Sequence, residues 1–396
     1  MRLVHLSDLH LGYRQYQRLT PGGVNQREAD VAATFRTAID RIIALRPDAV
    51  VVAGDIFHSV RPTNQAILHA FIQFSRLRQA LPDAPIVLLA GNHDVPRLAE
   101  TGGILQLFAQ LGLHVVDRDA KRLWFEESGL SILAIPGGPG VQRPSLSVDE
   151  NARFNVLLAH GVVPGAIPQL PGYEAVTEYT RAELTSSPWD YVAMGDYHVH
   201  QEIAPHIYYS GSLEYTSLNP WRDLEEEREG GVKGKGFVER NLATGEHTFH
   251  SVPGARQLID LPAIQGRNLA PADVDERIRS AVEGVKGGID DKVVRLIMRD
   301  VSRQIARELD HRAIREYKRR ALNFHLDVRR PELFRRESTG GAPGRRIELR
   351  EIVAEKLRMR PLDADVDRDA FVARAVGYID EAQAAAAAVP SLLAEA

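Results

Sequence analysis

The residues of this chain that could do chemistry stand directly after five short apolar runs. They are carboxylates, imidazoles and one amide: Asp8, His10, Asp55, Asn92, His93, His160, Asp196 and His198. Two divalent ions about 3.5–4 Å apart need a ligand set of this kind, with one carboxylate able to bridge both. Mixed carboxylate and imidazole donors suit manganese, iron or zinc, whereas magnesium and calcium prefer oxygen alone. The sequence therefore predicts a site for two divalent metal ions, with Mn first and Mg, Fe or Zn as alternatives.

The five apolar runs are predicted to be strands that are buried on both faces. They lack polar alternation and span 2–7, 49–54, 86–91, 155–159 and 191–195. Runs of this kind are typical of parallel strands covered on both sides. Because open α/β sheets build their sites at the carboxyl ends of strands, the polar residues above are expected to meet there.

Helices and hairpins complete the predicted core. Apolar residues at three- and four-residue spacing predict a helix over 26–45, which stops before Pro47, and another over 64–80. Hairpins are expected for 122–126 with 130–135 and for 236–242 with 246–252. We therefore expect an α/β fold, a layered sandwich of two mixed β-sheets flanked by helices.

The pattern changes near residue 255. Helix, strand, helix and strand are expected in turn at 271–284, 291–300, 304–320 and 321–328. This indicates a small α+β capping domain over 255–334, after a core domain over 1–254. Residues 335–346 have the composition of a linker, and two helices are expected at 347–359 and 366–388, so that 335–396 forms a linker and a helical C-terminal tail. Earlier, the charged, Gly-rich stretch 224–236 is expected to be a mobile excursion between two strands.

Composition excludes several classes of protein. The chain has 396 residues and no cysteine, which rules out disulfides, thiolate nucleophiles and cysteine-based metal sites. No Walker motif occurs, so the chain itself is not expected to be an ATPase. The N-terminus does not resemble a signal peptide, and no apolar run approaches the ~20 residues of a membrane span. We expect a cytoplasmic protein without membrane contact.

Charge is unevenly distributed along the chain. The net charge is −4, yet residues 301–360 hold 17 Lys and Arg against 9 Asp and Glu. A basic C-terminal region beside an acidic body favours a polyanionic partner, and a solvated surface is the alternative.

Five motifs carry a resemblance to a known family. They are SDLHLG (7–12), GDIFH (54–58), GNHD (91–94), AHG (159–161) and GDYHVH (195–200). Together they resemble the signature of the calcineurin-like metallophosphoesterases. With YYSGSLEYTS (208–217) and GKGFV (234–238), the chain resembles more narrowly the SbcD-type nuclease subunit of the DNA double-strand-break repair complex. The motifs cover residues 1 to about 240.

The resemblance implies a role for each matching residue. One metal would be held by Asp8, His10, Asp55 and His198, and the other by Asp55, Asn92, His160 and Asp196, with Asp55 bridging. His93 would act on the scissile phosphate or protonate the leaving oxygen without binding metal. His58, three residues after Asp55, would help to position the phosphate.

One position departs from the family pattern. The family usually has G-H-x-H where this chain has Gly195-Asp196-Tyr197-His198. A carboxylate can ligate a metal at about 2.0–2.2 Å, so Asp196 remains a candidate ligand. An alternative register would use His198 and His200 as the pair.

The resemblance and the site together imply a two-metal-dependent DNA exonuclease or endonuclease that hydrolyses phosphodiester bonds in DNA repair. Two other functions remain open: a small-molecule or cyclic-nucleotide phosphodiesterase on the same core, and a weakly active scaffold subunit. The implied partners are DNA, an SbcC-like coiled-coil ATPase of the SMC type that would bind the C-terminal helices, and a second copy of the chain. Candidate contacts to DNA, weighed against a solvated loop, are Arg61, Arg97, Tyr13 and Arg14.

Overall fold

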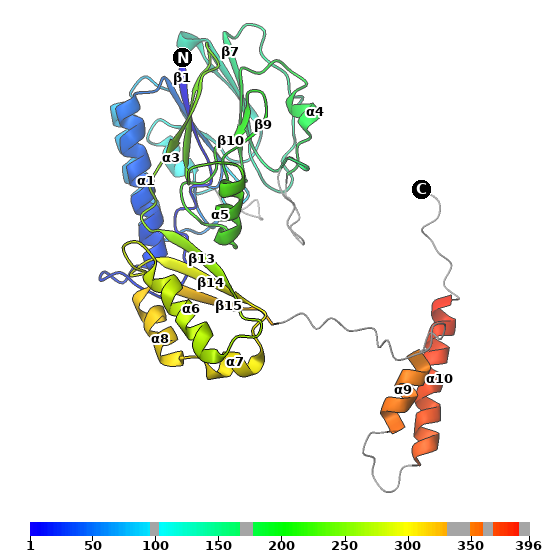
Figure 1. Cartoon of the computed structure of the whole chain (residues 1–396). Helices are drawn as coiled ribbons and strands as arrows, with labels where there is room; N and C mark the ends of the chain where they lie inside the picture. The colour runs from blue at the N-terminus through cyan, green and yellow to red at the C-terminus, as the bar shows by residue number, and fades with distance from the viewer. Residues whose placement is uncertain (96–102, 167–176, 331–348, 359–366, 388–396) are drawn as a thin grey trace. The chain divides into compact units, whose positions relative to one another are not determined.

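The fold is described from a computed structural model that covers residues 1–95, 103–166, 177–330, 349–358 and 367–387. The chain divides into two units, Met1–Pro331 and Glu332–Ala396. The first unit contains three β-sheets with the helices that cover them (Figure 1). The second contains two helices and is described separately below.

The first sheet has six strands in the order β12-β11-β1-β2-β3-β4. Its members are β1 (Arg2–Leu6), β2 (Ala49–Ala53), β3 (Ile86–Leu89), β4 (His114–Val116), β11 (Gly236–Asn241) and β12 (His247–Ser251). Strands β1 to β4 are parallel, and the β11–β12 hairpin extends the sheet antiparallel to β1. Along β2, Val50 and Val52 face the helices, whereas Val51 faces the second sheet. This alternation explains why the strand is apolar at every position.

The second sheet also has six strands, in the order β5-β6-β7-β8-β10-β9. Its members are β5 (Lys121–Phe125), β6 (Leu130–Ile135), β7 (Phe154–His160), β8 (Tyr191–Gly195), β9 (Gln201–Ala204) and β10 (Ile207–Tyr209). Strands β6, β7, β8 and β10 run parallel, and β5 and β9 close the edges antiparallel. A buried apolar layer fills the space between the two sheets. The predicted sandwich of two mixed sheets is therefore confirmed.

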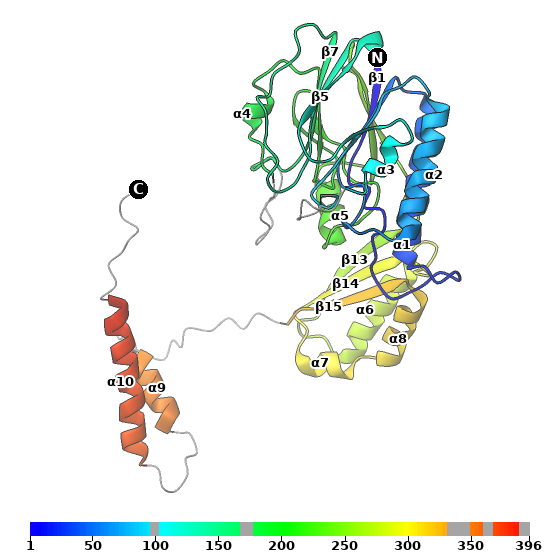
Figure 2. The ribbon, with the colours of Figure 1, turned by 180° about the vertical axis from the view of Figure 1, so that it is seen from behind.

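Two long helices, α1 (Gln26–Leu45) and α2 (Asn64–Ala80), lie side by side on the outer face of the first sheet (Figures 1 and 2). The side chain of Asn25 caps α1 by accepting bonds from two backbone amides, and the helix ends at Arg46 in a left-handed conformation. Both helices match the predicted ranges. Short segments α3 (Gln106–Ala109), η1 (Glu126–Ser128) and α4 (Arg181–Leu184) complete the loops.

The two sheets lie close together where β2 and β8 end. A Cβ atom on Gly195 would lie 1.8 Å from the carbonyl oxygen of Ala53, and one on Gly54 would lie 2.2 Å from Nδ1 of His160. Gly54 also has a φ of +91°, which side-chain-bearing residues rarely adopt. Glycine at these two positions therefore lets strand ends from different sheets meet around one small volume.

The third sheet has three parallel strands in the order β13-β14-β15. They are β13 (Leu258–Gln265), β14 (Val293–Arg299) and β15 (Asn323–Val328), and the helices around them are α6 (Pro271–Glu283), α7 (Arg303–Glu308) and α8 (His311–Arg320). The sheet and its helices enclose their own apolar cluster. The predicted helix over 271–284 and the predicted strands over 291–300 and 321–328 are confirmed. The single helix predicted over 304–320 is two helices, α7 and α8, and β13 was not predicted. The proposed limits of this region, 255 and 334, stay a prediction.

The expectation of a mobile excursion over 224–236 is wrong. Residues Pro220–Glu229 form helix α5, and the strand β11 begins at Gly236. Asp223, Glu227 and Lys235 are buried, which the charged composition did not suggest. The charges pair with one another inside the protein, as described below.

In the second unit, helices α9 (Leu349–Arg358) and α10 (Arg368–Ala387) contact each other. They match the two predicted C-terminal helices. The expected linker at 335–346 lies outside the described residues. Among the helices that the structure describes, none is long and apolar enough to cross a membrane.

Candidate metal centre

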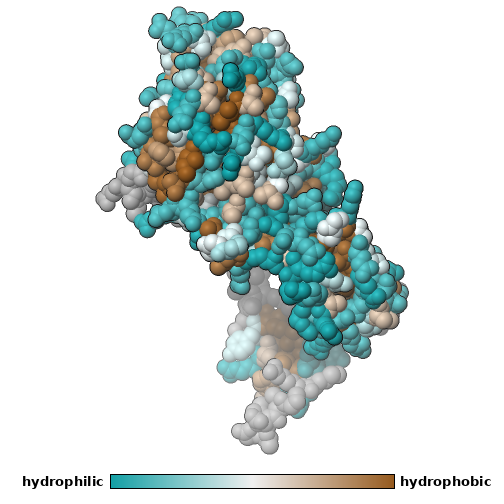
Figure 3. Space-filling model, turned by 90° about the vertical axis from the view of Figure 1, so that its left-hand side faces the viewer, coloured by the Kyte–Doolittle hydropathy of each residue, from teal (hydrophilic) through white to brown (hydrophobic). Residues whose placement is uncertain are grey.

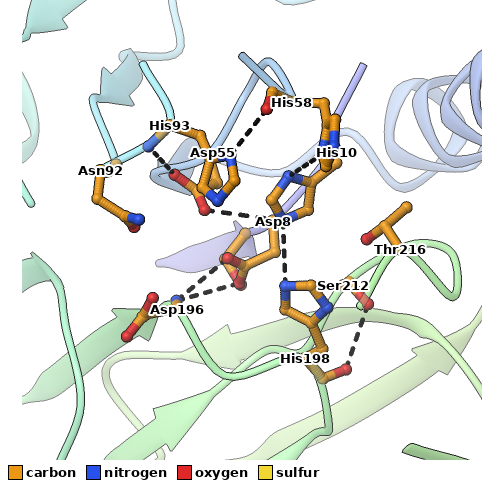
Figure 4. A network of polar contacts seen from close by, with 12 residues as sticks. Asp8, His10, Asp55, His58, Asn92, His93, Asp196, His198, Ser212 and Thr216 are labelled. Carbon is orange, nitrogen blue, oxygen red and sulfur yellow. Dashed lines mark hydrogen bonds and ion pairs between the residues drawn. The ribbon is translucent and has the colours of Figure 1, made fainter. Parts of the chain in front are cut away.

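Five strand ends from both large sheets place the predicted site residues together (Figure 4). The ends of β1, β2 and β3 supply Asp8 and His10, then Asp55, then Asn92 and His93. The ends of β7 and β8 supply His160, Asp196 and His198. Backbone bonds join the loops: the amide of Asp8 donates to the carbonyl of Gly54 (3.0 Å), and that of His10 donates to the carbonyl of Asp55 (2.9 Å).

The backbone at four of these residues is left-handed. The φ angles are 52° at Asp8, 44° at His10, 52° at Asp55 and 100° at Asp196. For a residue with a Cβ atom, this backbone conformation costs of order 1–3 kcal/mol of conformational energy, and such strain concentrates at functional sites. The strained turns direct side chains from successive strands into one shared space.

The first group of possible ligands comes from β1 and β8. Ligand atoms of Asp8, His10 and His198 all lie within 4.8 Å of one another. The Nε2 atoms of His10 and His198 are 3.0 Å apart, and Nε2 of His10 is 3.7 Å from Oδ2 of Asp55. These atoms face a common point and could hold one divalent ion.

The second group comes from β2, β3, β7 and β8. Nε2 of His160 lies 3.6 Å from Oδ1 of Asp55, 3.0 Å from Oδ1 of Asn92 and 3.6 Å from Oδ1 of Asp196. Asp55 therefore presents one carboxylate oxygen to each group. Asp8 also belongs to a cluster with Asp55 and His160, and its carboxylate accepts the backbone amide of Asp196 at 3.2 Å.

The tautomer of His160 favours a cation in the second group. Its Nδ1 lies 2.8 Å from the carbonyl oxygen of Ala53, so Nδ1 carries the proton and donates it there. Nε2 of the neutral ring then holds a lone pair. It faces the oxygens of Asn92, Asp55 and Asp196. A cluster of atoms that all accept is the arrangement that a metal ion completes.

Burial also leaves the site short of positive charge. Desolvation raises the pKa of Asp8 to about 7 and raises that of Asp55 well above its ordinary value. It lowers the pKa of His198 to about 4 and that of His10 well below its ordinary value. The imidazoles are therefore neutral, which is the form that binds metal, and the carboxylates lack a compensating cation. The residues present fit divalent metal ions.

His93 and His58 stand beside the two groups. Nδ1 of His93 donates to the carbonyl oxygen of His58 (2.7 Å), and the backbone amide of His93 donates to Oδ1 of Asp55 (3.0 Å). Their rings stack with centroids 5.4 Å apart. His93, His58 and His10 form a third cluster within 4.8 Å, so the structure brings both histidines to the site.

One positioning residue was missed by the analysis of the sequence. Asp94 is buried, and its carboxylate accepts backbone amides of Ile56 (3.0 Å), Phe57 (2.9 Å) and Gly91 (3.0 Å). It thereby ties the loop after β2 to the loop after β3. Its place after His93 marks it as part of the site, but only the structure distinguishes a side chain that binds backbone from one that faces a metal.

In the alternative register, His200 would be a metal ligand in place of Asp196. Nδ1 of His200 donates to the carbonyl of Tyr209 (2.9 Å), and its ring stacks on Phe249 at 4.4 Å. Asp196, in contrast, lies among the second group. The structure thus places Asp196 with the other candidate ligands and His200 apart from them.

The structure describes three of the four candidate contacts to DNA. Tyr13 is only 5% exposed and packs edge-on against His58, with ring centroids 5.0 Å apart, so it supports that histidine and offers little surface. Arg14 is 58% exposed and pairs with Glu28 at 2.6 Å. Arg61 is exposed, and Arg97 lies outside the described residues.

Comparison with known proteins agrees with this site. Residues 1–200 match the family of calcineurin-like phosphoesterases. The chain belongs to this family, and it is therefore an enzyme that hydrolyses phosphoesters with the help of divalent metal ions. The site residues named above lie at strand ends within the matched region.

Several curated proteins are similar over a longer range. A DNA double-strand break repair protein Mre11 from Methanococcus maripaludis is 28% identical over 296 residues, which is 71% of this chain and 70% of the relative. Proteins of the same name are 27% identical in Methanocaldococcus jannaschii, over 60% of this chain and 61% of the relative, and in Thermoplasma acidophilum, over 75% and 73%. The resemblance to repair nucleases inferred from the motifs is thus confirmed.

We predict that Asp196→Asn weakens Mn²⁺ binding by more than about tenfold, because one charged ligand is lost from the second group. His200→Asn is the matched control and should leave the affinity unchanged. Isothermal titration with Mn²⁺ alone measures both. The reverse result, in which only His200→Asn weakens binding, would establish the other register.

Proposed function

We propose that this chain is a two-metal-dependent DNA nuclease, exonuclease and endonuclease, that acts in double-strand-break repair in the cytoplasm. The observation that carries the proposal is the position of Asp55, whose two oxygens face two separate groups of donors. The names of the similar proteins support DNA repair as the setting.

In this proposal Asp8, His10, Asp55 and His198 hold one ion, and Asp55, Asn92, His160 and Asp196 hold the other. We propose manganese, because the donors mix imidazole with carboxylate. Bound divalent ions would stabilise the charge of the phosphate and supply a nucleophile from water near neutral pH. The contribution of the protein is to hold the two groups of donors a fixed distance apart through Asp55.

His93 is the proposed general acid. Its Nδ1–H donates to the carbonyl of His58, and this bond fixes the ring so that Nε2 is the nitrogen left for substrate. When the bond between phosphorus and the leaving oxygen breaks, the proton on Nε2 passes to that oxygen. Imidazole is the side chain that most often serves as a general acid near neutral pH. His58 would help to position the phosphate from the opposite side of the same ring stack.

The DNA backbone would be met by the exposed arginines Arg61 and Arg14, by Arg97, and by the region 255–334. The last turn of α8 holds Lys318, Arg319 and Arg320 in sequence. Tyr13 would act by holding His58. Phosphate contacts from such side chains position a duplex without reading its sequence.

An assay with labelled duplex and single-stranded DNA tests the function. We expect hydrolysis with Mn²⁺ and none with EDTA. His93→Ala should lower turnover about 10²–10⁴-fold, the usual contribution of a general acid, while two Mn²⁺ still bind. His114→Ala, a change to an exposed histidine on β4, is the control.

Three results would contradict this account. Hydrolysis of bis-p-nitrophenyl phosphate without any on DNA would indicate a small-molecule phosphodiesterase. A chain that binds no metal would be a scaffold. Loss of a metal ion in His93→Ala would make this residue a ligand.

We also propose that the chain is a homodimer that pairs through α2 and α3. Leu68 and Ile72 lie one helical turn apart on α2 and are 60% and 45% exposed, and Leu107 on α3 is 38% exposed. The view of this side in Figure 3 shows hydrophobic residues gathered in patches among hydrophilic ones. A two-fold axis would place such an apolar helix face against its own copy.

Light scattering after size exclusion tests the dimer. The double variant Leu68→Glu/Ile72→Glu should run as a monomer, because like charges would then face each other across the axis. Trp124→Glu is the control, since Trp124 is an exposed apolar residue on β5. A wild-type monomer, or a double variant that stays dimeric, is incompatible with this interface.

The helices α9 and α10 are proposed to bind an SbcC-like coiled-coil ATPase, which would supply the nucleotide switch that this chain lacks. Phe371 and Tyr378 on α10 remain 37% and 58% exposed. A helix pair this short does not bury enough apolar surface to be stable alone, so it needs a partner surface.

Removal of residues 340–396 should therefore abolish co-purification with the ATPase and leave Mn²⁺ binding by the first unit intact. Co-purification that survives the deletion would place the contact elsewhere in the chain.

A further inference from the structure

The loop that carries Asp196 and His198 is held from outside the metal centre. The backbone carbonyl of His198 accepts bonds from Nζ of Lys235 (2.8 Å), the amide of Ser212 (3.1 Å) and the hydroxyl of Ser212 (3.3 Å). The hydroxyl of Tyr197, in the same loop, donates to Glu226 of α5 at 2.8 Å. Contacts to α5 and to the residue just before β11 therefore fix this backbone.

Lys235 is the centre of a buried network of charges. Its side chain is 3% exposed, and Nζ lies 2.9 Å from Oδ2 of Asp223 and 3.0 Å from Oε1 of Glu227. Those carboxylates accept further bonds from Ser217 (2.8 Å) and Tyr215 (2.7 Å). The ammonium group thus donates hydrogen bonds to the His198 carbonyl and to Asp223, and Glu227 completes the network as an ion pair. A buried ion network of this kind fixes geometry more reliably than it adds stability.

The opposite side of α5 contacts the third sheet. Trp221 lies on the helix face opposite Asp223 and Glu227, as the 3.6-residue period requires, and Leu224 follows Trp221 one turn along. Trp221 is 9% exposed and packs with Val293 and Leu322, and the guanidinium of Arg295 on β14 lies 4.9 Å from its ring centroid. One helix of ten residues therefore touches both the third sheet and the loop of His198.

We propose that Lys235 is a positioning residue for His198. Through α5, the affinity of the site for metal then depends on how the third sheet packs against Trp221. This inference rests on the proposed metal site. A shift of β14 against Trp221 would move α5, and α5 would carry Asp223 and Glu227, and with them Lys235, relative to the His198 carbonyl. The third sheet would in this way adjust the metal centre without touching it.

Titration with Mn²⁺ alone tests the role of Lys235. Lys235→Met should weaken binding to the ion held by His198 by about 10–100-fold, the usual effect of losing a group that orients a ligand. The other ion, held by His160 and Asn92, should bind nearly as before. Lys235→Arg keeps the charge and should recover most of the affinity. Lys233→Met changes an exposed neighbour and is the matched control.

Lys235→Met leaves two buried carboxylates without a cation and could unfold the protein. The triple variant Asp223→Asn/Glu227→Gln/Lys235→Met removes all three charges together and keeps the shapes similar. It should fold, as circular dichroism would verify, and show the same selective loss of one ion. Equal weakening of both ions, or of neither, in a folded variant would overturn the role of Lys235.

A double-mutant cycle tests the link to the third sheet. At a temperature where the variant is folded, Trp221→Ala should weaken binding of the same ion several-fold, and Trp124→Ala should not. In the Lys235→Met or triple background, Trp221→Ala should have almost no further effect, because the path is already broken. Additive effects on affinity would mean that Trp221 acts by another route. If the wild-type chain binds no Mn²⁺, the proposed function fails instead, which separates the two tests.

Discussion

The structure depends on bringing the buried carboxylates of Asp8 and Asp55 together. Two buried carboxylates repel each other and lose hydration, and burial accordingly raises the pKa of both. No Lys or Arg in the described residues pairs with either of them. The arrangement is stable in its ionised form only when cations compensate, which is why neutral imidazoles and an amide surround it. The two sheets, the strained turns and the glycines at 54 and 195 all serve to bring these groups to one point.

Much of this design was predictable from the sequence, because chemistry and secondary structure coincide in it. Each apolar run ends in a ligand-type residue, and parallel strands carry such residues to the same edge of a sheet, so the grouping of Asp8 with Asp55, and of His160 with Asp196, followed from order along the chain. Helices α1 and α2 were predicted because their apolar spacing is regular, and Pro47 marks where α1 must end. The hairpins β5–β6 and β11–β12 were predicted because pairs of short strand-like runs flank a turn, which in the second hairpin is Thr244-Gly245.

The rest could not be predicted, because it depends on contacts between residues far apart in the chain. A run of Glu and Arg at 225–229 is typical of a solvated segment, and nothing local shows that Lys235 neutralises Asp223 and Glu227 inside the protein. Asp94 has the same chemistry as a ligand, and only its three backbone partners show that it holds loops together. Likewise, the sequence offers both His198 and His200 as possible ligands, and only their contacts in the folded protein distinguish them.

The central claim is that Asp55 joins two metal sites built from both sheets. A crystal structure of the chain grown with Mn²⁺, with the ions located by anomalous scattering, tests it directly. The account predicts two peaks about 3.5–4 Å apart, each within about 2.0–2.2 Å of an oxygen of Asp55. A single peak, or two peaks of which only one contacts Asp55, would contradict it.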